Sequence, residues 1–312
     1  MFIIFAGQHI KTVILSSSIS HSPLRYPGGK SCLSGFIANL ARLNDLENGV
    51  YCELYAGGAG AALSLLFEGT FRHIHINDAD YNIYAVWFAI LNHTEEFIER
   101  LENTPVTIAE WHLQRQIYLQ GRAADIIDLG FSTFFLNRTN RSGIIYKAGP
   151  IGGQDQTGNY KIDVRFNKVE LKRRIQAIAA RAEDITLTNE DAVAIIRNLV
   201  QYHPNTDDLF LYLDPPYYNK GKMLYLNNYD HFNHQTLANA VAELGDDITW
   251  LISYDNVDQI RDMYQGYNMS SFDLNYTLQS KRFGSELLVF SPEMNLPAEI
   301  VVNSRTSELV LI

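Results

Sequence analysis

Short apolar runs alternate with longer segments of helical composition at both ends of the chain. The apolar runs end in turn residues and are typical of buried strands, whereas the segments between them have the apolar spacing of helices. Strands separated by such helices predict βαβ units and a mainly parallel sheet. The predicted strands are 49–55, 73–77, 208–214 and 249–254, and the predicted helices are 61–69, 81–93, 230–245 and 255–267.

The end of the chain has a different pattern. Two apolar segments, 272–279 and 286–292, flank the residues KRFGS. This arrangement predicts an antiparallel hairpin that closes the sheet.

The alternation stops between about 95 and 183. This region contains mostly helical segments, a Gly-rich stretch over 147–161 and an amphipathic helix over 167–184. Leu171, Ile175 and Ile178 share one face of that helix, with its basic residues on the other. The region therefore resembles an insertion. The predicted domains are an α/β domain formed by 22–94 and 184–292, a helical insertion over 95–183, and terminal extensions over 1–21 and 293–312.

Composition narrows the class of protein. Of 312 residues, 46% are hydrophobic and 19% charged, which is enough to bury a large core and excludes a disordered chain or a coiled coil. No apolar run reaches the ~18 residues that a membrane span needs, so we expect no membrane association. Two cysteines, Cys32 and Cys52, do not make a disulfide framework, and we therefore expect a reduced, cytoplasmic protein.

Charge is distributed unevenly along the chain. The net charge of −10 argues against a nucleic-acid partner when taken alone. The window 138–181, however, contains ten Lys and Arg residues and three acids, which gives it a charge of +7. Either this window contacts nucleic acid, or it is a solvated basic helix face.

Three glycines stand where the first predicted strand meets its helix. They are Gly57, Gly58 and Gly60 of the motif ELYAGGAG over 53–60. Glycines at this place allow the backbone to approach a ligand closely, with the amino terminus of the helix facing it. Folds that bind dinucleotides or S-adenosylmethionine both use such a turn, and a tight turn without a ligand is the alternative.

An acid closes the second predicted strand. Asp78 of INDAD (76–80) lies where such folds place the carboxylate that accepts hydrogen bonds from both ribose hydroxyls of a nucleoside. Asp80 is the rival for this role. Either acid could instead cap the helix that begins near Tyr81.

The motif DPPYY, which begins at Asp214, follows a buried strand. The two prolines fix an extended backbone that has no amide donors. The Asp214 carboxylate and the Pro215 carbonyl are therefore two rigid neighbouring acceptors. Such a pair can hold both hydrogens of an exocyclic amine and localise its lone pair for attack. Tyr217 can stack on a base taken out of a duplex.

With these motifs in order, the chain resembles the Dam-type, D12 class DNA adenine methylases. The resemblance rests on RYPGGK (25–30), ELYAGGAG, INDAD, FFLNRTNRSG (134–143), DPPY and GSELLVF (284–290). It implies a Rossmann-like S-adenosylmethionine-dependent methyltransferase: a mixed seven-stranded sheet with one antiparallel strand and a helical target-recognition insertion. The implied reaction moves a methyl group from S-adenosylmethionine to N6 of adenine in duplex DNA, by base flipping and direct in-line transfer.

The resemblance also implies roles for individual residues. Asp214, Pro215 and Tyr217 would be catalytic, and no metal is implied. Asn137, Arg138, Asn140, Arg141 and Lys147 would contact DNA. The residues expected to bind the cofactor are Tyr26, Lys30 (as a cation for the methionine carboxylate), Tyr55, Gly57, Gly58, Gly60, Asp78, Asp214 and, as a weaker carry-over that could equally be a helix cap, Asp191.

Departures from the family pattern leave some points open. The segment NRTNRSGII over 137–145 differs from the family's recognition loop, so specificity for GATC is not inherited. An RNA adenine or DNA N4-cytosine methyltransferase, or an inactive DNA-binding module, is an alternative. We expect a monomer, in a phage or restriction-linked setting or a housekeeping one. We also expect His73 and His75 to lie on an exposed strand face and not to bind a metal.

Overall fold

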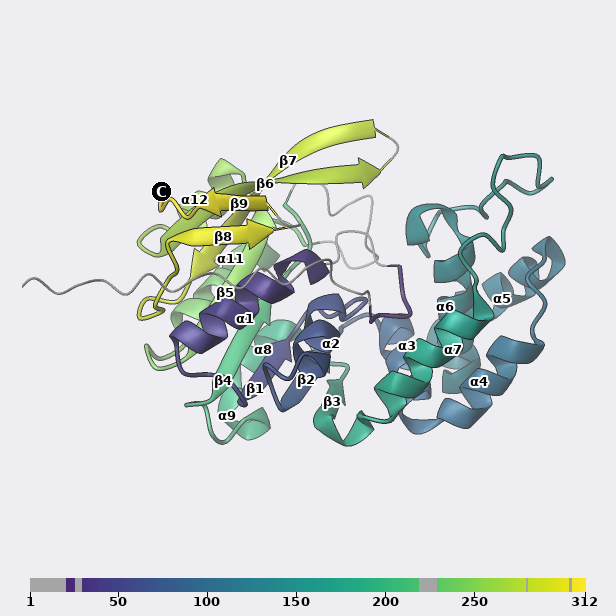
Figure 1. Ribbon diagram of the computed structural model, residues 1–312, viewed down its shortest axis with the longest axis horizontal. Coiled ribbons are helices and arrows are strands. Elements are labelled where there is room, and N and C mark those ends of the chain that lie inside the picture. Colours follow the sequence, from purple (N-terminus) through teal and green to yellow (C-terminus); the bar gives the residue numbers. More distant parts are fainter. Residues whose placement is uncertain (1–20, 26–29, 219–228, 279, 303–304) are drawn as a thin grey trace, which may run out of the picture.

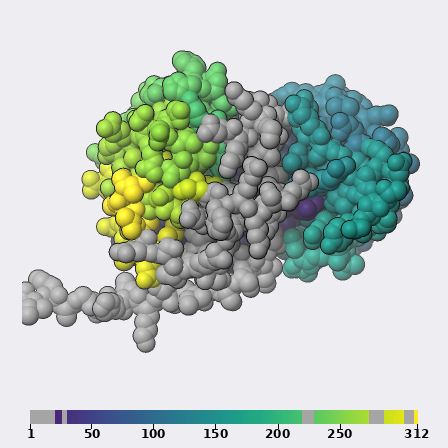
Figure 2. Space-filling view, turned by 90° about the horizontal axis from the view of Figure 1, so that it is seen from above, coloured from purple at the N-terminus to yellow at the C-terminus, as the bar shows by residue number. Residues whose placement is uncertain are grey.

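The computed structural model describes residues 21–25, 30–218, 229–278, 280–302 and 305–312, without side chains over 273–284 and 301–308. Two lobes lie side by side, one built around a sheet and one made of helices (Figure 1). Figure 2 shows the same division from above, with the helical lobe in blue and teal. Within the described residues, no helix is long and apolar enough to cross a membrane.

A mixed seven-stranded sheet forms the first lobe, as the family resemblance implies. The apolar pattern predicts six of its strands and misses β3. The strand order of the sheet is β3-β2-β1-β4-β5-β7-β6. The first five strands are parallel, and β7 is antiparallel to both β5 and β6. The order reverses between β1 and β4, and the crevice outside the carboxyl ends of such strands is where open α/β sheets bind ligands. The strands are β1 Val50–Glu53, β2 His73–Asn77, β3 Ile185–Thr188, β4 Leu209–Leu213, β5 Thr249–Asp255, β6 Asn268–Leu278 and β7 Ser280–Phe290.

Helices cover both faces of this sheet. Because side chains alternate along a strand, Tyr51 and Tyr212 pack into one core and Cys52 and Leu211 into the other. All four residues are buried, as is typical of parallel strands covered on both sides. On this lobe, the helices packed in the first core are α1 (Ser34–Leu43) and α2 (Gly60–Phe67), and those in the second are α8 (Ala192–Arg197), α9 (Leu199–Tyr202), α11 (His231–Ala242) and α12 (Asp258–Met263). The first core continues into the helical lobe.

The second lobe contains five longer helices: α3 (Tyr81–Asn92), α4 (Thr94–Asn103), α5 (Ile108–Gln120), α6 (Ile126–Thr139) and α7 (Lys168–Ala179). The predicted apolar face of α7 is buried in it, with Leu171, Ile175 and Ile178 at most 1% exposed. Helix α3 packs against α6 and α7 and also against β3. It therefore connects the two lobes through packing as well as through the chain.

The carboxyl-terminal part differs in detail from the prediction. The hairpin is longer than expected, because KRFGS continues β7 and does not form the turn. The predicted extension after 292 contains a further antiparallel pair, β8 (Glu299–Val302) and β9 (Arg305–Glu308), which packs against α1. Of the predicted extension over 1–21, all but residue 21 lies outside the described residues.

The contact between α3 and α6 depends on a glycine. A Cβ on Gly130 would lie 2.3 Å from the carbonyl oxygen of Ala85. We predict that Gly130→Ala lowers the free energy of unfolding by about 2 kcal/mol, because one helix has to move away from the other. Urea unfolding of the purified protein measures this change.

Gly35→Ala is the matched control. Gly35 is exposed in α1, and a Cβ there would meet nothing within 4 Å. Alanine should stabilise the helix by about 0.5–1 kcal/mol. If Gly130→Ala were also neutral or stabilising, close packing would not be what joins α3 to α6.

Candidate active site

The sequence motifs that carry chemistry meet at one edge of the sheet. The glycine turn follows β1, Asp78 follows β2, and Asp214 follows β4. Parallel neighbours end at the same edge, so segments far apart in the sequence come together at the point where the strand order reverses. Three of the predicted site motifs therefore lie at the edge of the sheet where open α/β folds bind their ligands.

The glycine turn is joined directly to Asp78. Gly57 has φ +47°, in the left-handed region that favours glycine, and its N–H donates to Asp78 Oδ2 at 2.8 Å. The indole N–H of Trp87 in α3 donates to the Gly57 carbonyl at 2.9 Å. Gly60 allows the turn to pack closely against Ser31, since a Cβ on Gly60 would lie 3.2 Å from Cβ of Ser31. Gly58 lies between them in the turn.

Asp78 and Asp80 have different roles in the structure. Asp80 caps α3, because its side chain accepts from the N–H of Asn82 at 2.9 Å. Asp78 is half-buried, and its Oδ1 accepts from the N–H of Asp80 at 2.9 Å. Each Asp78 oxygen keeps a lone pair for a further donor, which fits a ribose diol. Burial raises the pKa of Asp78 to about 7.

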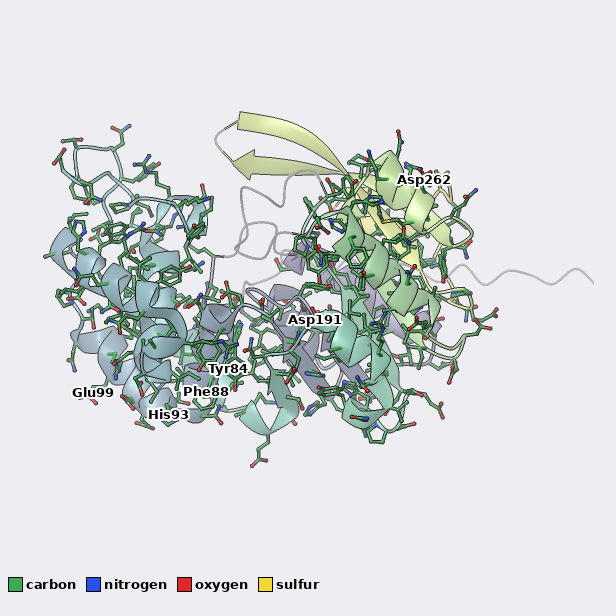
Figure 3. All side chains as sticks on the ribbon, turned by 180° about the vertical axis from the view of Figure 1, so that it is seen from behind. Tyr84, Phe88, His93, Glu99, Asp191 and Asp262 are labelled. Carbon is green, nitrogen blue, oxygen red and sulfur yellow. The ribbon has the colours of Figure 1, made fainter. Side chains whose placement is uncertain are left out.

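Tyr55 and Asp191 are two further residues that the sequence predicts to bind the cofactor. The Tyr55 hydroxyl is 2.8 Å from that of Tyr229, which precedes α11. Asp191 is exposed and caps α8 by accepting from the N–H of Ala194 at 3.1 Å (Figure 3). The helix-cap alternative for Asp191 is therefore what the structure contains, and Tyr26 lies outside the described residues.

Lys30 binds the acid of DPPY. Its ammonium lies 2.9 Å from Oδ1 and 3.1 Å from Oδ2 of Asp214, and 2.8 Å from the Tyr217 hydroxyl. Lys30 is 4% exposed and the Asp214 side chain 17%. The sequence prediction gave Lys30 to the cofactor carboxylate, whereas here it holds both oxygens of the catalytic candidate.

Two residues that the sequence prediction missed complete this network. Ser253 of β5 donates its hydroxyl to Asp214 Oδ1 at 2.8 Å. Glu286 of β7 is 1% exposed, accepts from the Tyr217 hydroxyl at 2.6 Å and places Oε2 3.8 Å from the Lys30 ammonium. Glu286 stands in the quoted motif GSELLVF, where an acid among apolar residues was the available signal.

Asp255 and Glu53 are further buried acids at this edge. Asp255, which ends β5, is 6% exposed and accepts from the N–H of Tyr218 at 2.8 Å, so it fixes the chain just after DPPY. Glu53 ends β1, is 4% exposed and accepts from the N–H of Ala62 at 3.1 Å. Burial raises the pKa of Glu53 to about 8, so its neutral form dominates at pH 7.

Pro215 is buried, and the Tyr217 hydroxyl contacts both Lys30 and Glu286. The Tyr217 ring is 7% exposed, and the Lys30 ammonium lies 5.0 Å from its centroid. In this conformation the ring offers little surface for stacking on a base. Its visible contacts are with the ion network.

The predicted DNA contacts divide into buried and exposed residues. Asn137 and Asn140 are fully buried, which contradicts a direct contact with DNA in this conformation. Asn137 accepts from the Arg25 N–H at 2.7 Å and donates to the carbonyls of Arg25 and Gly143, while Asn140 accepts from the Trp111 indole at 2.7 Å. The side chains of both asparagines are hydrogen-bonded to backbone groups or to the Trp111 indole, so they hold the loop in its conformation.

Gly143 explains why this loop lies so close to the segment before α1. It has φ +74°, and a Cβ there would lie 2.0 Å from the Arg25 carbonyl oxygen. Arg138 is half-buried and donates to the carbonyl of Arg165. Burial and then the neighbouring Arg25, Arg174 and Arg165 lower the pKa of Arg138 to about 9. The arginines therefore lie close enough to concentrate positive charge.

Arg141 and Lys147 are the exposed members of the predicted set. Arg141 donates weakly to the Pro150 carbonyl at 3.4 Å, and the Lys147 ammonium lies 4.8 Å from the centroid of the Tyr146 ring. On α7, by contrast, Lys172 pairs with Glu102 at 2.6 Å and Arg173 with Glu170 at 2.8 Å. Arg174 also pairs with Glu170, so three of the four basic residues of α7 have an acid partner within the lobe.

The prediction that His75 lies on an exposed strand face is wrong. His75 is 1% exposed and hydrogen-bonded to His203 and Thr188, because its side of β2 faces the core under α9. His73 is half-buried and lies 2.8 Å from the Thr186 hydroxyl.

Comparisons with known proteins agree with the motif order. A family model described as "D12 class N6 adenine-specific DNA methyltransferase" matches residues 26–278. A search of the curated proteins gave no match.

Solved structures were also compared. One is an S-adenosylmethionine-dependent methyltransferase from Agrobacterium tumefaciens (11% identity, TM-score 0.35), where the alignment covers 82% of this chain and 62% of that one. Another is an rRNA methyltransferase from Streptomyces viridochromogenes (12% identity, TM-score 0.36), with 86% and 88% covered. At these TM-scores we draw nothing from either likeness.

The family model covers most of the chain, including every motif from the RYPGGK tyrosine to DPPY. The family's methyl donor is S-adenosylmethionine, and the glycine turn with Asp78 fits its nucleoside. The chain belongs to the D12 class of N6 adenine-specific DNA methyltransferases.

Proposed function

We propose that this protein transfers a methyl group from S-adenosylmethionine to the N6 amine of an adenine that is flipped out of duplex DNA. One observation supports this proposal most strongly. The Asp214 carboxylate is fixed by Lys30 and Ser253 at the strand end that adjoins the glycine turn and Asp78. The proposed amine acceptor and the proposed nucleoside site therefore lie at one edge of the sheet, where adenine and cofactor would be held close together.

Asp214 has capacity left for the target amine. Among the described residues, Oδ1 accepts from both Lys30 and Ser253, whereas Oδ2 accepts from Lys30 alone. An ionised carboxylate has about four acceptor sites. We assign the amine to Oδ2 and to the Pro215 carbonyl, which has no neighbouring amide donor from Pro216.

The reaction is a direct displacement. When bound, S-adenosylmethionine supplies a methyl group on a sulfonium: the N6 lone pair forms the new C–N bond while the C–S bond breaks, and S-adenosylhomocysteine leaves. Asp214 and Pro215 orient the lone pair, and the methylated nitrogen then releases one proton to water. Positioning supplies most of the rate, because the leaving group is already activated.

We assign Lys30 to positioning Asp214. Its ammonium contacts both carboxylate oxygens and holds that group in one rotamer. Its predicted contact with the methionine carboxylate stays a proposal, as does base stacking by Tyr217 and cofactor stacking by Tyr26. Asp78 would accept from the ribose hydroxyls, the backbone at Gly57 and Gly58 would approach the cofactor, and Tyr55 and Asp191 would lie at its adenine end.

We propose that 22–94 and 184–292 form the catalytic domain and that 95–183 recognises the target. Arg138 with its neighbours Arg25 and Arg165, and the exposed Arg141 and Lys147, support this division. None of them has an ion pair among the described residues, and phosphate contacts require unpaired positive charge. Such an enzyme would work in the cytoplasm beside its DNA. The monomeric state and a restriction or phage setting remain predictions.

Asp214→Ala tests the reaction. We predict a loss of at least about 100-fold in methyl transfer to duplex DNA, because the amine loses its main acceptor, with S-adenosylhomocysteine binding largely retained. Transfer is measured with labelled cofactor on DNA and on RNA, and binding by calorimetry. Asp262→Ala, in the exposed part of α12 (Figure 3), should behave as wild type. Near-normal turnover by Asp214→Ala would contradict the assignment.

The pKa of Asp78 predicts a pH dependence of cofactor binding. Ribose hydroxyls donate to the ionised carboxylate, whose pKa of about 7 in the free protein means that it protonates below neutrality. S-adenosylhomocysteine should therefore bind about tenfold more weakly at pH 6 than at pH 8.

Two variants separate Asp78 from its neighbour. Asp78→Asn should bind weakly at every pH and lose the dependence. Asp80→Asn should keep the dependence but shift it to lower pH. Asparagine still caps the helix, whereas the Asp80 charge that helps to raise the pKa of Asp78 is removed. A wild-type pH profile in Asp78→Asn would remove Asp78 from the ribose role.

The exposed basic loop predicts a salt dependence of DNA binding. Arg141→Ala with Lys147→Ala should lower the slope of log K against log[salt] by about 2, since each lost phosphate contact removes about 0.9. Lys172→Ala is the control, because Lys172 is already paired with Glu102. If the control lost as much slope as the double variant, α7 would be the DNA-binding face.

A further inference from the structure

Three side chains that could bind a metal lie close together, and none of them belongs to the candidate active site. They are Cys52 of β1, His75 of β2 and His203, which follows α9. Their exposed fractions are 0%, 1% and 8%. Cys52 and His75 are register partners in the parallel sheet, so their side chains project from the same face.

The distances suit a tetrahedral ion. Cys52 Sγ lies 3.5 Å from His75 Nδ1, and His75 Nδ1 lies 2.9 Å from His203 Nε2. All three ligand atoms lie within 4.8 Å of one another. With Zn–S near 2.3 Å and Zn–N near 2.0–2.1 Å, tetrahedral geometry requires edges of about 3.6 Å for S–N and about 3.3 Å for N–N. The Cys52–His75 edge already fits, the His75–His203 edge needs a small expansion, and the third edge, between Cys52 Sγ and His203 Nε2, is at most 4.8 Å.

A hydrogen-bond chain fixes which nitrogen of His75 has the lone pair. Asn77 donates its amide to the carbonyls of Leu54 and Glu190, so its Oδ1 is the acceptor. The Thr188 hydroxyl donates to that oxygen at 2.8 Å and must therefore accept from His75 Nε2 at 2.8 Å. A neutral His75 then has its proton on Nε2 and its Nδ1 lone pair pointing at Cys52 and His203. Metal-ligating histidines are typically oriented by such a partner.

The surroundings favour neutral imidazoles, which are the ligating form. Burial lowers the pKa of His75 to about 3 and also lowers that of His203. Burial raises the pKa of the Cys52 thiol, and a bound cation would reverse this by stabilising the thiolate. Without an ion, the Cys52 thiol and a His203 N–H both have the same His75 lone pair as acceptor.

We propose that Cys52, His75 and His203 bind one Zn²⁺, with water as the fourth ligand, in a site that stabilises the fold. Thiolate and imidazole are ligands that zinc prefers. The ion would join β1, β2 and the connection before β4. Through Thr188 and Asn77 the same network reaches the strand ends that hold the glycine turn and Asp78. This inference does not depend on the proposed reaction.

Zinc titration of the tag-free, chelator-treated full chain tests the proposal. Competition with a chromophoric chelator should give one Zn²⁺ per chain and a higher melting temperature. Cys52→Ala and His203→Gln should each weaken zinc binding at least about 100-fold, since even outer partners of a zinc site contribute 10–100-fold. Co²⁺ should give a thiolate charge-transfer band that Cys52→Ala abolishes.

His73→Gln is the matched control, because His73 is in the same strand, bonds Thr186 and is not part of the cluster. It should bind zinc as wild type does. If Cys52→Ala fails to fold by circular dichroism, His203→Gln, nearest the surface, decides. No zinc uptake by wild type, or wild-type affinity in His203→Gln, would leave only a hydrogen-bonded histidine pair.

Discussion

The contact between Lys30 and Asp214 is the interaction on which the rest of the site depends. Lys30 is almost fully buried, and an ammonium in that position without a partner would cost several kcal/mol. The pair therefore requires the segment before α1 to meet the end of β4. Glu286 links β7, which is antiparallel to β5, to this pair. Three distant parts of the chain are thus held at one place, and the proposed amine acceptor has a single orientation.

A second set of contacts builds the nucleoside half of the crevice on the same edge. Asp78 accepts from the backbone of the glycine turn, and Asn77 beside it ties together the ends of β1 and the segment after β3. The proposed zinc ligands are connected to these residues, because His75 bonds Thr188 and Thr188 bonds Asn77. Side chains therefore connect the strand ends at the edge that would bind the cofactor, and this makes the edge rigid. The hydrogen bonds between the parallel strands do not connect the segments that follow the strand ends.

The helical lobe shows how charge in a sequence differs from charge on a surface. The basic window is strongly positive in the sequence, yet α7 pairs much of its share with Glu102 and Glu170. Arg141 and Lys147 remain exposed and have no ion pair among the described residues, in a loop whose backbone carbonyls accept hydrogen bonds from Asn137 and Asn140. Conformation thus divides one predicted set of DNA contacts into loop-forming residues and residues that face solvent.

Local periodicity and turn chemistry are enough to predict most of the strands and helices, the glycine turn and the acids that end the strands. Which groups meet depends on tertiary packing. Lys30 lies on Asp214, Asn137 is buried, and His75 faces Cys52 and His203. These partners are separated by many residues, and which face of a strand is covered depends on the helices that pack on it. Local patterns do not contain that information.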